Sequence, residues 1–223
     1  MNIKLFSEAI MKVLLGILII GLLLFLPAGT INYWNGWLLM GLLFIPMFIA
    51  GIVMMIKSPE LLKKRLNLKE KQGKQKQVVL LSALMFIAGF IVAGFNFRYG
   101  WGVFPNIVII ISSIIFVLSY IVYAEVLREN KYLSRTIEVQ ENQKVIDSGL
   151  YGIVRHPMYM STIFLFLSMP LILGSIYSFV IFLIYPIIIA KRIKNEEEVL
   201  EKELEGYAEY KNKVKYKMIP FIW

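Results

Sequence analysis

The sequence contains no cysteine and only one histidine, His156, among its 223 residues. The absence of cysteine excludes disulfides, thiolate metal ligands and a cysteine nucleophile. A single histidine also makes a zinc site of the usual kind implausible. Charge is scarce as well, because only 17% of the residues are Asp, Glu, Lys or Arg, against about a quarter in ordinary globular proteins. Any chemistry must therefore use other groups.

Apolar sequence takes the place of charge, since 58% of the residues are hydrophobic. Apolar runs long enough to cross a hydrocarbon core of about 30 Å as helices lie at 11–27, 36–56, 78–96 and 104–123. A fifth apolar region, 158–190, is longer than one span and is interrupted by Pro170 and Gly174-Ser175, which predicts a helical hairpin of two short spans. We therefore expect an all-α integral membrane protein with five to six transmembrane helices.

The net charge of +9 is concentrated between the second and third spans. The basic residues there are Lys57, Lys63, Lys64, Arg65, Lys69, Lys71, Lys74 and Lys76, against Glu60 and Glu70. Basic loops stay cytoplasmic, so this loop, the N-terminus, residues 124–156 and the C-terminal tail are predicted to be cytoplasmic. We expect a prokaryotic plasma membrane. Basic loops of membrane proteins contact anionic lipids, so no nucleic-acid partner is expected.

Candidate polar groups gather around the histidine. Pro157 suits the first turn of a helix and pushes His156 toward extended backbone, so a helix is predicted to begin here. Its unpaired N–H groups, with Arg155 beside them, suit a carboxylate or phosphate. Tyr151 and Tyr159 bracket the histidine and can hold a cation against their rings. The alternative is a plain membrane boundary with interfacial aromatic residues.

A second group of candidates lies on the predicted C-terminal helix, which should run from Lys191 to about Lys213. Its apolar stripe contains Ile189, Ile193, Leu200, Leu204 and Tyr207. Glu196 falls on this stripe, where a carboxylate is costly unless paired, and this favours a ligand-facing role. Arg192 stands one turn earlier, so a plain i, i+4 ion pair is the alternative. The predicted solvated face contains Glu197, Glu198, Glu201, Lys202 and Glu205.

Two further local features are predicted. Residues 136–146 alternate or cluster around Glu141-Asn142, which indicates a short β-hairpin. The chain ends in Ile219-Pro220-Phe221-Ile222-Trp223, whose aromatic side chains suit a membrane interface.

Several of these motifs recur in order along the chain. They are Gly149-x-Tyr151-x-x-Val154-Arg155-His156-Pro157-x-Tyr159, Arg192-x-x-x-Glu196-Glu197-x-x-Leu200, Gly206-Tyr207-x-x-Tyr210 and Ile219-Pro220. Together they resemble the isoprenylcysteine carboxyl methyltransferase family. The related phospholipid N-methyltransferases share the Glu-Glu part. Residues 1–120 match only as a set of spans.

The resemblance implies S-adenosyl-L-methionine as methyl donor and a prenylated or other lipid-like acceptor in the bilayer, with no metal. The cofactor contacts that it implies are Gln143, Lys144, Val145, Ile146, Tyr151, His156, Pro157, Met158, Tyr159 and Glu196, to which the helix-start argument adds Arg155. Arg192 corresponds to the arginine that binds the acceptor carboxylate, and we expect Arg192 and Glu196 to be the catalytic pair. The chain is then one methyltransferase domain over 1–223, with four spans in 1–123 and the cofactor-binding part in 124–223.

Other functions remain open at this point. An amine acceptor must lose a proton, so a phospholipid or amine N-methyltransferase would make His156 or Glu197 a candidate base. A sterol-type reductase using NADPH has a comparable helical layout. A non-enzymatic adaptor or transporter is less consistent with the sequence, because the four spans hold almost no ionisable residue besides Lys12.

Ser161 and Phe221 depart from the family pattern, in which glycine is common at both positions.

Overall fold

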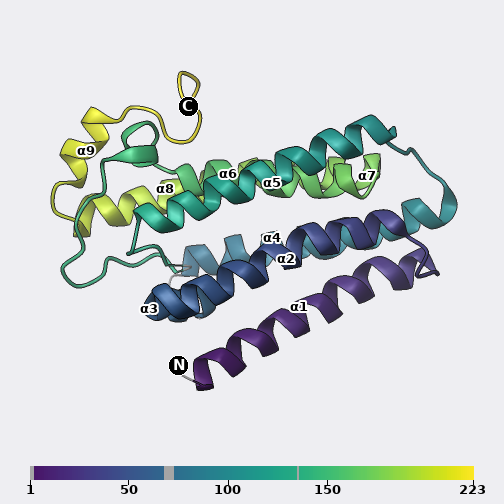
Figure 1. The fold of residues 1–223 in the computed structure, drawn as a ribbon. Helices are drawn as coiled ribbons and strands as arrows, with labels where there is room; N and C mark the ends of the chain where they lie inside the picture. The colour runs from purple at the N-terminus through teal and green to yellow at the C-terminus, as the bar shows by residue number, and fades with distance from the viewer. Residues whose placement is uncertain (1–2, 68–72, 135) are drawn as a thin grey trace.

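The computed structural model describes residues 3–67, 73–134 and 136–223, which form a bundle of helices (Figure 1). The N-terminal part contains α1 (Ile3–Ala28), α2 (Trp34–Lys57), α3 (Pro59–Leu66), α4 (Gly73–Tyr99) and α5 (Asn106–Glu129). The C-terminal part contains the 3₁₀ turn η1 (Gly149–Gly152), α6 (Pro157–Ile172), α7 (Ile176–Phe182), α8 (Tyr185–Glu203) and α9 (Tyr207–Lys213). Residues 68–72 of the predicted basic loop, with Lys69, Glu70 and Lys71, lie outside the described residues.

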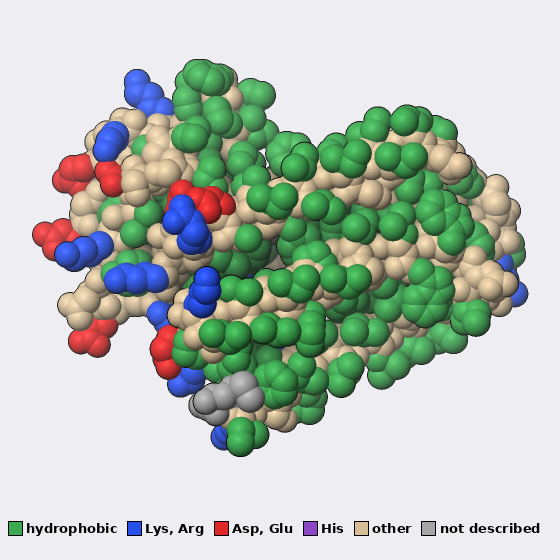
Figure 2. All heavy atoms as spheres, viewed as in Figure 1, with side chains coloured by type: hydrophobic (Ala, Val, Ile, Leu, Met, Phe, Trp, Pro, Cys, Tyr) green, Lys and Arg blue, Asp and Glu red, His purple; other side chains and the backbone are tan. Residues whose placement is uncertain are grey.

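The fold class predicted from composition is confirmed. Within the described residues, five helical segments are long and apolar enough to cross a membrane: Ile3–Ala28, Trp34–Lys57, Gln75–Tyr99, Asn106–Glu129 and Ile176–Glu203. Helix α6 is apolar but shorter. Figure 2 shows apolar side chains over most of the long helices, while Lys, Arg, Asp and Glu gather at the end that carries α3 and α9. An outward-facing apolar surface of this kind is what lipid contact requires.

The predicted hairpin is present, with α6 as one arm and α7 followed by α8 as the other. Gly174 turns the chain with a φ of +74°, and the Ser175 side chain caps α7 by accepting from the Ser178 N–H at 3.2 Å. The second arm does not end where the apolar sequence ends, because α8 runs from Tyr185 to Glu203. Helix α8 continues into the polar end of the molecule, so the expected helix after the hairpin is the extension of its second arm. It breaks at Gly206, where φ is +81°, and α9 follows.

The β-hairpin predicted for 136–146 is wrong, because this segment forms no strand pair. The chain reverses at Gln140 and Gln143, where the Gln143 N–H donates to the Gln140 carbonyl at 3.0 Å and Asn142 has a φ of +55°. The Gln140 amide instead donates to the Tyr132 carbonyl at 2.5 Å and accepts from Lys64 at 2.5 Å. The segment is thus fixed by side chains from other elements, and consecutive residues at 136–138 and 143–146 line a pocket instead of pairing as strands.

Small residues let the spans approach closely. A Cβ on Gly94 of α4 would lie 2.5 Å from the Leu24 carbonyl oxygen of α1 and 2.9 Å from the Pro27 side chain. Small residues at such crossings are how helices in lipid gain packing energy. The α1–α4 contact therefore depends on the absence of a side chain at Gly94.

We expect Gly94→Ala to destabilise the folded protein by about 1–3 kcal/mol, because the obstructing atom belongs to a helix backbone that must shift. The measurement is thermal unfolding of the purified protein in detergent. Gly51→Ala is the matched control, since a Cβ at Gly51 in α2 meets nothing within 4 Å. Equal unfolding midpoints for the two variants would contradict the packing argument.

Candidate functional site

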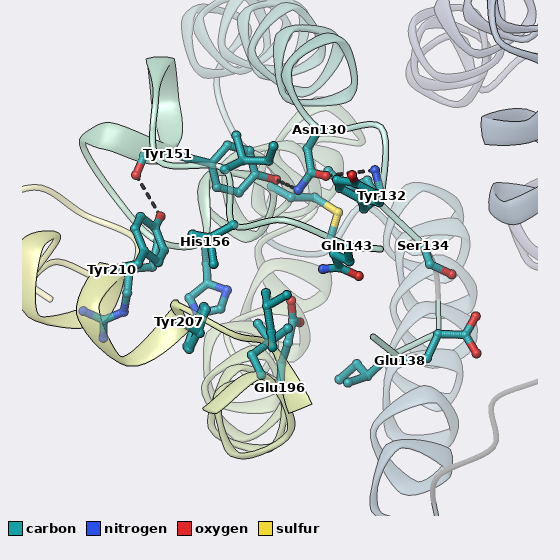
Figure 3. Close-up of a pocket in the computed structure, with 18 of the residues that line it drawn as sticks. Asn130, Tyr132, Ser134, Glu138, Gln143, Tyr151, His156, Glu196, Tyr207 and Tyr210 are labelled. Carbon is teal, nitrogen blue, oxygen red and sulfur yellow. Dashed lines mark hydrogen bonds between the residues drawn. The ribbon is translucent and has the colours of Figure 1, made fainter. Parts of the chain in front are cut away.

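A pocket lies at the polar end of the molecule, with about 850 Å³ of space free of protein atoms, part of it open solvent. Its lining comes from the end of α5, the segment before η1, the start of α6, helix α8 and the start of α9. The lining residues are Asn130, Tyr132, Leu133, Ser134, Thr136, Ile137, Glu138, Gln143, Lys144, Val145, Ile146, Tyr151, Arg155, His156, Met158, Tyr159, Arg192, Glu196, Leu200, Leu204, Tyr207 and Tyr210. Figure 3 shows His156 and Tyr207 on one side of this space and Ser134 and Glu138 on the other.

The structure brings the predicted site residues together. The Gln143–Ile146 segment, Tyr151, Arg155, His156, Met158, Tyr159, Arg192 and Glu196 all line this one pocket. Pro157 does not line it but begins α6, as its preference for the first helical turn predicts. The pocket therefore gathers groups from four separate parts of the sequence, although their binding roles stay predictions.

Tyr151 is positioned by the turn η1. Gly149 has a φ of +58°, and a Cβ there would collide with the Glu129 carboxylate, which accepts the next backbone N–H at 3.0 and 3.2 Å. The Tyr151 hydroxyl accepts from the Asn130 amide at 3.0 Å, and its carbonyl accepts from the Tyr210 hydroxyl at 2.8 Å. Tyr151 is buried, so it belongs to the wall of the pocket rather than to an interfacial belt.

The start of α6 is fixed by the C-terminal tail. The Arg155 N–H donates to the Tyr216 carbonyl at 3.0 Å, and the His156 N–H donates to the Lys217 carbonyl at 2.7 Å. His156 is the N-cap residue of α6, and its imidazole Nε2 lies 3.2 Å from Glu197 Oε1. The single histidine is therefore buried between two elements and held on both its backbone and its ring.

Glu197 corrects the helix-face prediction, because its side chain is buried rather than solvated. Its Oε1 accepts from Arg155 Nε at 2.8 Å, and its Oε2 lies 3.2 Å from Lys217 Nζ. The Arg155 guanidinium also donates to the Val214 and Lys215 carbonyls at 2.7 and 2.9 Å. The C-terminal tail at 214–217 covers this side of α8. The helix is therefore buried on two sides, whereas a single apolar stripe predicts burial on one side only. This geometry commits Arg155 to the tail and does not favour it as a ligand for a cofactor carboxylate.

Arg192 and Glu196 both reach the pocket and are joined through Tyr159. The Tyr159 hydroxyl accepts from Arg192 Nε at 2.9 Å and donates to Glu196 Oε2 in a short hydrogen bond. The guanidinium carbon lies 5.9 Å from the centre of the Tyr159 ring. Arg192 Nη1 donates to the amide oxygen of Gln75 at 3.2 Å. The i, i+4 pair considered from the sequence is thus part of a relay through a buried tyrosine.

Tyr207 lines the pocket, although it was expected only on the apolar stripe and in a family motif and was not among the predicted cofactor contacts. It is buried, and its hydroxyl has no hydrogen-bond partner among the described residues. Burial, with the nearby Glu197 and Glu196 carboxylates, raises the pKa of Tyr207, so it remains a neutral O–H donor. A buried donor without a partner costs about 1–3 kcal/mol. The Gly206-Tyr207 motif was the signal that could have identified it.

The segment 130–138 was also missed. Asn130, Tyr132, Ser134, Thr136 and Glu138 line the pocket from this stretch. Residues 130–134 directly follow α5 and belong to no predicted element, and 136–138 were predicted only as part of a β-hairpin, so the sequence pattern did not indicate a site here.

We expect Glu197→Gln to destabilise the protein by about 3 kcal/mol, because it leaves the buried Arg155 guanidinium without a countercharge. Glu203→Gln is the control, since Glu203 is exposed near the end of the same helix. Thermal unfolding in detergent measures both. If the two variants unfold at the same temperature, the ion pair does not hold the tail against α6 and α8.

Comparison with known proteins gives one positive finding. Residues 99–202 match the family model described as the isoprenylcysteine carboxyl methyltransferase family. The match begins earlier than the motifs predicted and ends before Gly206-Tyr207 and Ile219-Pro220. No curated protein sequence matches the chain. The family match confirms the resemblance seen in the motifs: residues 99–202 of this chain, whose described part holds five candidate membrane-spanning helices, are similar to methyltransferases of the isoprenylcysteine carboxyl methyltransferase family.

Proposed function

We propose that this protein transfers a methyl group from S-adenosyl-L-methionine to the carboxylate of a membrane-borne, prenylated amphiphile. The observation that carries the proposal is the Arg192–Tyr159–Glu196 relay at the edge of the pocket. This group of side chains includes a guanidinium suited to a carboxylate, beside a space lined by the residues that the motif resemblance assigns to the methyl donor.

The pocket fits the chemistry of S-adenosyl-L-methionine, which combines a purine, a ribose, a charged amino-acid end and a sulfonium. Glu196 would accept from a polar group of the donor, and the unpartnered Tyr207 hydroxyl would donate to one. The rings of Tyr132, Tyr151 and Tyr159 would face purine or cation. When bound, this molecule supplies an electrophilic methyl group.

The protein's own task is then to place the acceptor and exclude water. A guanidinium orients a carboxylate by two parallel hydrogen bonds. The hydrogen bond from Arg192 Nε to the Tyr159 hydroxyl fixes the orientation of the guanidinium plane. Holding the reacting atoms at about 3–3.5 Å in line is the main source of acceleration in such displacements. The carboxylate is ionised at neutral pH, so no side chain has to remove a proton.

The same geometry argues against an amine acceptor. The candidate bases for deprotonating an amine were His156 and Glu197, and both are buried in the network with Arg155 and the tail. A carboxylate held by two or three cations is a poor base. We therefore place N-methylation second, and we place the pocket on the cytoplasmic face, where the basic loops gather and a soluble donor is present.

The proposed acceptor is tested by supplying labelled S-adenosyl-L-methionine to the purified protein with an S-prenylcysteine analogue, a total lipid extract or phosphatidylethanolamine. We expect label only in a base-labile methyl ester of the prenylcysteine. Arg192→Lys should lower kcat/KM by about tenfold or more, because a point charge replaces the fork. Label in the phospholipid amine, or full turnover by Arg192→Lys, would contradict the proposal.

The proposed methyl-donor site is tested by calorimetry with S-adenosylhomocysteine. We expect Glu196→Gln and Tyr207→Phe each to weaken binding by about fivefold or more, because each removes one hydrogen bond inside a buried site. Tyr177→Phe, at an exposed tyrosine on α7, is the control. Thermal stabilisation by NADPH but not by S-adenosylhomocysteine would favour the reductase alternative.

A further inference from the structure

Gln75 is a buried amide with half of its hydrogen-bonding capacity unused. It lies in the first turn of α4 and is fully buried. Its Oε1 accepts from Arg192 Nη1 at 3.2 Å, whereas its Nε2 has no partner among the described residues. The orientation of the amide is fixed by this contact, because a guanidinium only donates and so requires the oxygen side. The NH₂ group is therefore a donor that lacks an acceptor.

The position of Gln75 separates it from the methyl-donor pocket. Gln75 does not line that pocket, although Arg192, Tyr159 and Glu196 do. Helix α4 packs against α8, so Gln75 contacts Arg192 from outside the pocket while Tyr159 contacts it from inside. In methyl transfer the acceptor and the donor approach from opposite sides of the moving methyl group. The Gln75 side of Arg192 thus lies away from the donor pocket, and it is the side to which we assign the acceptor.

The residue type is informative as well. A carboxylate at this position would form a buried ion pair with Arg192 and would cancel the charge that an acceptor carboxylate needs. A neutral amide oxygen instead contacts the guanidinium without adding a negative charge beside it. A buried donor left unsatisfied costs about 1–3 kcal/mol. If position 75 served packing alone, an apolar residue there would give a more stable fold. Both facts point to a ligand that completes the site.

We propose that Gln75 is a second acceptor-binding residue: its Oε1 orients Arg192, and its Nε2–H donates to the acceptor carboxylate that Arg192 holds. This inference rests on the proposed carboxyl methylation and deepens it. It also assigns a role to a helix outside the family match, which begins at residue 99. The acceptor carboxylate would then be bound by Gln75 from α4 and by Arg192 from α8. Two membrane-spanning segments would thus contribute to the acceptor site.

The test compares Gln75→Glu and Gln75→Met with Gln77→Glu. Gln77 lies two residues further along α4 and is exposed, so it receives the same change in charge away from the site. Each purified variant is assayed for KM and kcat with an S-prenylcysteine carboxylate and for competitive inhibition by the matching neutral carboxamide. Calorimetry with S-adenosylhomocysteine reports whether the donor pocket is intact.

We expect Gln75→Glu to raise KM for the carboxylate by about tenfold or more and to change the inhibition constant of the carboxamide by less than about threefold. Gln75→Met should raise KM less, and Gln77→Glu should behave as wild type. Donor binding should be unchanged in all three, which separates loss of acceptor binding from loss of folding.

Two results would overturn this inference alone: an unchanged KM in Gln75→Glu, or equal weakening of carboxylate and carboxamide. A wild-type protein that methylates no carboxylate at all would instead overturn the proposed function, and this inference with it.

Discussion

The buried contact between Arg155 and Glu197 is the constraint on which the site depends. It joins Arg155, two residues before α6 begins, to α8, and through the Val214 and Lys215 carbonyls it also holds the C-terminal tail. Removing two charges from water is expensive unless each is fully paired. Because the pairing requires three separate segments, the pocket wall forms only when all three are in place.

The contact explains why the adjacent residues Glu196 and Glu197 have different surroundings. Glu196 lines the pocket, whereas Glu197 is turned by about 100° around the helix and lies under the tail. One acidic residue is thus left for a ligand and the other is used to assemble the walls. The histidine belongs with the second group, because its ring contacts Glu197 and its backbone holds the tail.

Much of the fold and part of the site could be predicted from the sequence, because they depend on local rules. Apolar runs gave the spans, Pro157 gave the start of α6, and the motifs indicated the residues that line one pocket. The burial of Glu197 depends on where the tail crosses α8, and helical periodicity carries no information about that. The contact between Gln75 and Arg192 joins residues 117 positions apart, so neither local pattern nor motif could reveal it. The segment 136–146 does not form a hairpin because side chains from other elements hold it, and its consecutive residues line the pocket instead of pairing with each other.

Helix α8 connects the polar site directly to the apolar part of the molecule. Its 19 residues continue the second arm of the hairpin out of the apolar region and carry Arg192 and Glu196 on the way. At about 1.5 Å per residue, such a helix is a rigid lever of about 28 Å. Helices in thinner or thicker bilayers respond by tilting. Because both polar side chains belong to one helix, any tilt of α8 would move Arg192 and Glu196 together relative to the opposite wall at 143–146.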